Sequence, residues 1–91
     1  MHKSERVWTT KLQMRQVLLE EWDPIGIRDE PLAQDEYDSY LRHIYDLLAR
    51  DASELQIANH LNQLETVSMG MRGRPIEKLL SVAQSLKRIA L

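Results

Sequence analysis

The placement of glycine and proline constrains the fold of this 91-residue chain more than any other feature. All three glycines and all three prolines lie in two short segments, residues 23–34 and 70–75. Elsewhere apolar residues recur at intervals of three and four, the period of an amphipathic helix, and no stretch alternates as a strand does. The pattern predicts an all-α fold, a compact array or bundle of about four amphipathic helices in one domain, residues 1–91.

The first two helices are expected on either side of the segment 23–34. One runs from about residue 6 to residue 22 and ends there, because the residue before Pro24 is pushed out of the helical region. The other runs from about residue 35 to residue 50, with acidic residues in its first turn, where the helix dipole favours anions. Each has one apolar stripe: Trp8, Leu12, Arg15, Leu19 and Trp22 in the first, and Tyr37, Tyr40, Leu41, Ile44, Leu47 and Leu48 in the second.

Two further helices complete the expected fold. The third opens at Ser53, whose spacing to Gln56 is that of a capping box, and Gly70 is a natural residue to end it. The fourth starts with Pro75 as its first helical residue. We expect the third to bury Leu55, Ile57, Ala58, Leu61, Leu64 and, as a further candidate, Val67, and the fourth to bury Ile76, Leu79, Leu80, Ala83, Leu86 and Ala90.

The connection formed by residues 23–34, called here the 23–34 loop, is long for an unstructured link in a compact domain. Gly26 lies between two isoleucines and is expected to take a positive φ in a turn that both isoleucines anchor. A loop this apolar is expected to fold back on the helices as an ordered cap. The residues expected to structure it are Trp22, Pro24, Ile25, Gly26, Ile27, Pro31, Tyr37 and Tyr40.

Aromatic side chains flank this loop. All five tryptophans and tyrosines lie in the first half of the chain, and phenylalanine is absent. Trp22 and Tyr37 are expected to pin the loop, with their polar tips on its backbone groups. The alternative is that they anchor a partner, since tryptophan and tyrosine are favoured at the centres of interfaces.

Charge is distributed unevenly along the chain. Residues 20–38 contain eight acids and one base, Arg28, whereas residues 67–91 carry a net charge of +4. The two ends either attract each other within the fold and face water, or the acidic segment forms a face for a basic partner. The candidate interaction surface is Asp23, Asp29, Glu30, Asp35, Glu36 and Asp38.

Three strings in this region carry a resemblance: WDPIGI from residue 22, DEP from residue 29 and DEYDSY from residue 35, followed later by Met69-Gly70. They resemble a family of small bacterial proteins known only as a domain of unknown function. The resemblance implies a small α-helical cytoplasmic protein of bacterial origin and brings no activity with it. By analogy of size, some proteins of this kind are antidotes to toxins.

Composition and motifs argue against several other classes. The net charge of −2 gives no positive potential to attract nucleic acid. Residues 57–68 resemble a helix-turn-helix motif, but they lack a turn signal and the recognition end is not basic. Without cysteine there is no disulfide, thiol nucleophile or cysteine zinc site. His2, His43 and His60 have no helical partner four residues away, and no catalytic loop motif occurs. We therefore expect no catalytic residue, cofactor or metal, and no membrane span.

The sequence thus favours a non-enzymatic module that binds a protein, with a basic protein as the candidate, through its acidic loop and the start of the second helix. The narrower alternative is an antidote-like or regulatory protein that blocks a basic target. From another class, a small-ligand binder or weak enzyme would need a pocket under the 23–34 loop, over Trp22 and Tyr37. The oligomeric state stays open.

Overall fold

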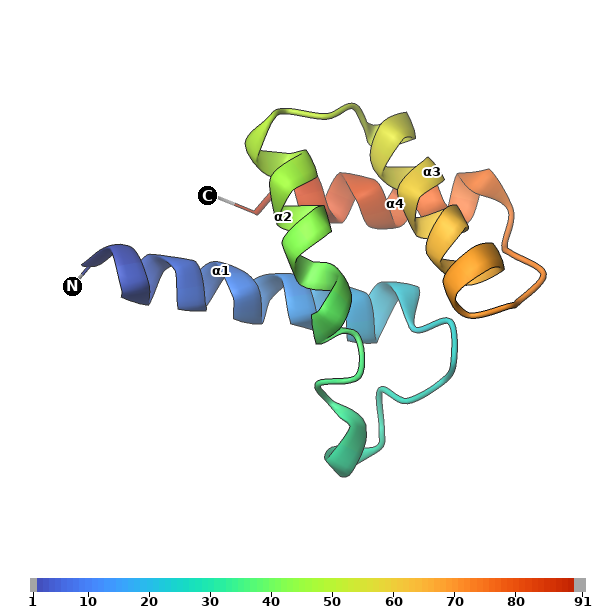
Figure 1. The fold of residues 1–91 in the computed structure, drawn as a ribbon, viewed down its shortest axis with the longest axis horizontal. Helices are drawn as coiled ribbons and strands as arrows, with labels where there is room; N and C mark the ends of the chain where they lie inside the picture. The colour runs from blue at the N-terminus through green and yellow to red at the C-terminus, as the bar shows by residue number, and fades with distance from the viewer. Residues whose placement is uncertain (1, 90–91) are drawn as a thin grey trace.

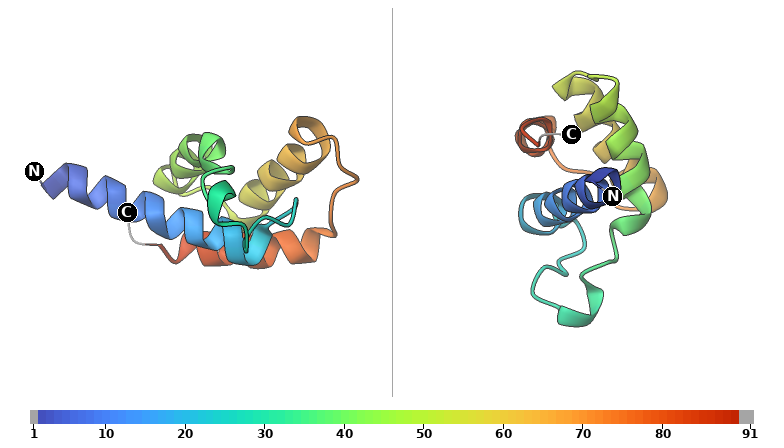
Figure 2. Two further views of the ribbon diagram at one scale, coloured as in Figure 1. Left: turned by 90° about the horizontal axis from the view of Figure 1, so that it is seen from below. Right: turned by 90° about the vertical axis from the view of Figure 1, so that its left-hand side faces the viewer.

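Four α-helices and no strand occur in the computed structural model, which describes residues 2–89, with side chains from residue 8 onward. The helices are α1 (His2–Val17), α2 (Leu41–Ala49), α3 (Glu54–Gln63) and α4 (Ile76–Lys87). Helices α1 and α4 form one layer, and α2 and α3 lie across it as a second layer (Figures 1 and 2). The expectation of an all-α array of about four helices is confirmed.

Helices α1 and α3 each end in a wider, π-helical turn. After α1 the turn η1 (Leu18–Trp22) ends at Asp23, whose backbone N–H donates to the carbonyl of Leu18 at 2.7 Å. After α3 the turn η4 (Leu64–Ser68) ends in the same way, with the N–H of Met69 on the carbonyl of Leu64. The predicted end of the first helix at residue 22 therefore holds.

Two predicted helix starts are wrong. The second helix begins at Leu41 instead of residue 35, because residues 38–40 form a 3₁₀ turn, η3 (Asp38–Tyr40), before it. Tyr37, at φ −89° and ψ 0°, is the residue just before that turn, and its side chain is buried in the core. Pro75 is the cap of α4, with an extended ψ of 142°, so the helix proper starts one residue later than predicted. Ser53 and Gln56 form the predicted capping box in full.

The core lies between the two layers. Several residues of the predicted stripes are nevertheless exposed. The N-terminal end of α1 extends past the other helices (Figure 1), and Leu55 of α3 and Val67 of η4 lie outside the core. Ala90 lies outside the described residues. The exposed members are Trp8, Leu12, Leu55 and Val67, and the buried core comprises Met14, Leu18, Leu19, Trp22, Tyr37, Leu41, Ile44, Ala52, Ile57, Ala58, Leu61, Leu64, Leu79, Val82, Ala83 and Leu86.

Candidate functional site

The 23–34 loop projects from the helices, with a short 3₁₀ turn, η2 (Pro31–Ala33), at its end (Figure 1). The prediction that it folds back on the helices as a cap is therefore wrong. Gly26 has the predicted positive φ, +68°. Only one of the two isoleucines anchors the loop: Ile27 is half-buried against the core, whereas Ile25 is 48% exposed. The prediction that both isoleucines pack inward is therefore wrong for Ile25.

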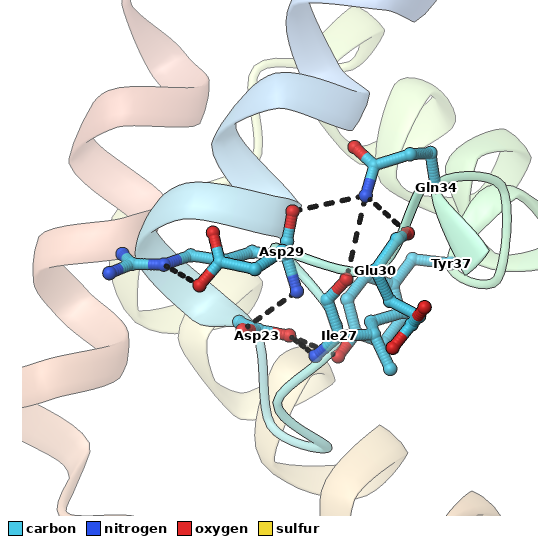
Figure 3. A network of polar contacts seen from close by, with 7 residues as sticks. Asp23, Ile27, Asp29, Glu30, Gln34 and Tyr37 are labelled. Atoms are coloured by element: carbon cyan, nitrogen blue, oxygen red, sulfur yellow. Dashed lines mark hydrogen bonds and ion pairs between the residues drawn. The ribbon is translucent and has the colours of Figure 1, made fainter. Parts of the chain in front are cut away.

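Asp23 holds the loop from its base (Figure 3). Its carboxylate accepts the backbone N–H of Ile27 at 2.7 Å, the hydroxyl of Tyr37 at 2.9 Å and the N–H of Arg28 at 3.3 Å. Burial alone would raise the pKa of Asp23, but these three donors together hold it below its usual value. The carboxylate of Asp23 therefore makes its hydrogen bonds within the loop and does not face a partner.

Tyr37 connects the loop to the core. Its ring is 1% exposed and packs on Trp22 with 5.2 Å between ring centroids. Its hydroxyl donates to Asp23 and accepts the N–H of Ile25 at 3.2 Å, as predicted for a polar tip on the loop backbone. Burial raises the pKa of Tyr37, and the neighbouring Asp23 carboxylate raises it further.

Gln34 closes the loop at its other end, a role that sequence reasoning missed. Its side-chain amide donates to the carbonyls of Glu30 at 2.8 Å, Arg28 at 3.0 Å and Ile27 at 3.5 Å (Figure 3). One side chain thus contacts three carbonyls of the loop, and two of them, those of Ile27 and Glu30, also accept backbone N–H groups within it. No local spacing rule marks a glutamine for this task.

Trp22 differs from its prediction, because its indole N–H turns away from the loop. It donates at 2.7 Å to Glu65, whose side chain is 1% exposed. Glu65 also accepts the backbone N–H of Arg74 at 3.0 Å and forms an ion pair with its guanidinium at 3.5 Å. The same guanidinium donates to the backbone carbonyl of Trp22. This network joins the ends of α1 and α3 to the segment before α4.

The six acids of the predicted surface fall into two groups. Asp23 is bound within the loop, and Asp38 forms a bidentate pair with Arg15, at 3.1 and 2.5 Å. The other four, Asp29, Glu30, Asp35 and Glu36, have exposed side chains. The guanidinium of Arg28, the base nearest to them in sequence, lies 4.0 Å from Asp29. Four acids between residues 29 and 36 are therefore exposed, on the loop and just after it.

The residue that sequence reasoning missed at this surface is Leu32. It lies in the 3₁₀ turn at the end of the loop and is 94% exposed, the most exposed large apolar side chain among those described. Its position between two acidic pairs in the sequence was the available signal. We define the acidic loop surface as Asp29, Glu30, Leu32, Asp35 and Glu36.

The described residues were predicted to hold no metal and no membrane span, and the ligand-binding alternative needs a pocket under the loop. Among the side chains of residues 8–89, no group of three histidines, aspartates or glutamates is placed to hold a metal ion. No helix in the described part of the chain has the length and apolarity to cross a membrane. The hollow beside the loop, about 380 Å³, is lined partly by Leu19, Arg28 and Gln34 and is open and polar. The rings of Trp22 and Tyr37 are each 1% exposed.

Comparison with known proteins finds no family model, no curated protein and no solved structure that matches this chain. The resemblance drawn from the WDPIGI and DEYDSY strings therefore stays a prediction.

Proposed function

We propose that this protein is a non-enzymatic interaction module that docks a basic protein on its acidic loop surface. The observation that supports this most is Leu32, which is 94% exposed at the end of a loop whose backbone is held by three side chains. A leucine side chain that an ordered loop holds in water contributes no burial free energy to folding. It gains free energy only when a partner covers it.

The charges near Leu32 in the sequence indicate the kind of partner that this surface would bind. Asp29, Glu30, Asp35 and Glu36 are all exposed and flank Leu32 in the sequence, so this segment is net negative on either side of one apolar side chain. Such an arrangement complements an apolar pocket with a basic rim, in which the leucine supplies affinity and the acids accelerate encounter. Because Asp23, Gln34 and Tyr37 order the loop before binding, little conformational entropy is lost on docking.

The ligand-binding alternative has weaker support. It requires a pocket over Trp22 and Tyr37, but these rings pack on each other and leave no free face for a ligand. The antidote-like alternative uses the same acidic loop surface, with the basic target inactivated by docking. In this proposal the protein acts in the bacterial cytoplasm, where a chain without cysteine needs no oxidising environment.

The test is site-directed photocrosslinking in the native host, with the photoreactive residue in place of Leu32. We expect a basic protein to be captured there and not from Leu55, an exposed leucine on the outer face of α3. The purified partner should then bind the wild-type chain and the variant Leu55→Ser alike, and bind Leu32→Ser about tenfold more weakly or worse. Equal capture from both positions, or an acidic partner, would contradict the proposal.

A further inference from the structure

A hollow of about 420 Å³, called here the groove, opens between α1 and α2, and its lining is mainly apolar. The buried side chains of Met14 and Leu41 line it together with the half-buried ring of Tyr45. The hollow beside the 23–34 loop is instead mostly polar. Sites for small molecules have a volume of this order and are lined mainly by apolar and aromatic side chains with a few polar groups.

Two cationic side chains line the groove, one on each wall. Lys11 belongs to α1 and Arg42 to α2, and neither forms an ion pair with another described residue. The ammonium of Lys11 lies 5.3 Å from the centroid of the exposed Trp8 ring, a contact that leaves its charge uncompensated. Both cations are therefore available to an anion in the groove.

The acids of the groove do not balance these cations. Asp38 is already held by Arg15 in a bidentate pair, at 3.1 and 2.5 Å. Asp46 lies one turn after Arg42 on α2 but forms no ion pair with it. Two positive charges therefore stand against one negative charge, and the groove keeps one positive charge in excess.

The apolar lining and the excess charge together select a class of ligand. A bare inorganic anion would pair with the cations but leave the apolar lining in water. An uncharged apolar molecule would cover the lining but leave both cations without a partner. A molecule with one carboxylate and an apolar chain does both, because covering apolar surface is favourable and a guanidinium binds a carboxylate through two parallel hydrogen bonds.

We infer that the groove binds a small monocarboxylate with an aliphatic chain. The chain covers Met14, Leu41 and Tyr45, and the carboxylate lies between Lys11 and Arg42. A flexible chain suits this place, because it can follow an open groove between two helices. The site uses no residue of the acidic loop surface, so the inference does not depend on the function proposed for that surface.

The test is an NMR titration of the isotope-labelled full chain with octanoate. We expect saturable shifts of the backbone amides of Met14, Leu41 and Tyr45, whereas the amide of Leu55 on α3 should keep its position. Octanol has the same chain without the charge and should bind about tenfold more weakly or worse, and octyltrimethylammonium, with the opposite charge, should bind more weakly still. Equal binding of all three would show that the chain alone adsorbs, and would overturn the inference.

Charge variants test the carboxylate contact separately from the apolar lining. Lys11→Gln and Arg42→Gln should each weaken the binding of octanoate, and the double variant should weaken it about tenfold or more. Asp46→Asn removes the like charge from the groove and should tighten the binding. Lys78→Gln, at an exposed site on α4 that does not line the groove, is the matched control for one lost positive charge and should bind octanoate as the wild type does.

The amide spectrum of each variant also shows whether the variant keeps the fold, so a loss of binding is separated from unfolding. Octanoate that shifts no amide of the groove overturns the inference. So does octanoate that binds the double variant and Lys78→Gln with the same affinity.

Discussion

The indole N–H of Trp22 and the buried carboxylate of Glu65 form a hydrogen bond of 2.7 Å between residues 43 positions apart. Glu65 lies in the π-helical turn after α3 and Trp22 in the one after α1. In both turns the helix widens where a buried side chain has to reach this network. The unusual helix ends and the polar contact in the core are therefore parts of one arrangement.

The first prediction concerns this carboxylate. Glu65→Ala leaves the buried indole N–H of Trp22 without its acceptor, at a cost of about 1–3 kcal/mol, whereas the partly exposed guanidinium of Arg74 can be solvated by water. Glu65→Gln keeps one acceptor oxygen and should lose less. Urea denaturation followed by circular dichroism measures both. Gln13→Ala, at an exposed site on α1, is the control and should change the free energy of unfolding little.

The second prediction concerns Tyr37. Tyr37→Phe keeps the ring but removes the hydroxyl that joins Asp23 to the N–H of Ile25, at a cost of about 1–3 kcal/mol. Because Asp23 loses a donor, its pKa should move back toward its usual value, which NMR titration of its carboxyl carbon would detect. Tyr40→Phe is the matched control, since the Tyr40 hydroxyl makes no hydrogen bond to another described residue. An unchanged pKa in Tyr37→Phe would contradict this view of the loop.

The third prediction concerns pH. Burial lowers the pKa of His60 below 6.5, the nearby His43 lowers it further, and the buried Nε2 of His60 has no partner among the described residues. The unfolded chain therefore binds a proton more readily than the folded one, so the free energy of unfolding should fall as pH decreases below about 6.5. His43 and His60 line one hollow of the surface, and the other charged groups that line it are Asp46 and Arg50.

Thermal melts between pH 7.5 and 5 check this expectation. His60→Gln should flatten the slope, whereas Asp23, with its lowered pKa, should act only at pH values near and below 3.8. A slope near pH 6 that survives in both His60→Gln and the double variant with His43→Gln would show that other groups cause it.

The fourth prediction compares two glycines with positive φ. At Gly26 a Cβ would meet nothing within 4 Å, so Gly26→Ala should cost about 1 kcal/mol from backbone strain alone. At Gly73 a Cβ would lie 2.9 Å from Cγ2 of Thr66, so Gly73→Ala adds a steric clash to the strain and should cost more. Thermal melts of both variants test the order. Equal midpoints would count against the packing of Gly73 on α3.

The fold was predictable from the sequence wherever a local chemical signal determines structure. In the capping box, the side chains of Ser53 and Gln56 each accept the backbone N–H of the other residue. Gly26 takes the positive φ that its turn requires. The acids of residues 35–38 resemble a first helical turn in the same local sense. That prediction was wrong because the pair of Arg15 with Asp38 and the burial of Tyr37 depend on contacts across the fold.

The candidate site was predictable only as a region. Its acids are visible in the sequence, but the division between occupied and exposed acids depends on Tyr37, 14 residues from Asp23, and on Arg15, 23 residues from Asp38. The exposure of Leu32 follows from the direction in which the loop projects. No periodicity encodes that direction, so a leucine there resembles any other core residue.

The last prediction tests the acids of the loop directly. Asp29 and Glu30 have exposed side chains, so Asp29→Asn with Glu30→Gln should leave the melting temperature nearly unchanged, since exposed charges contribute little to stability. With the basic partner captured at Leu32, the double variant should associate more slowly at low salt, and its rate should depend less on salt, because exposed charges act mainly on encounter. Glu54→Gln, an exposed acid on α3, is the matched control for one lost charge. The role of these acids is falsified if the double variant associates at the wild-type rate in low salt. If the double variant unfolds instead, Asp29 and Glu30 stabilise the loop itself and the acidic segment is structural.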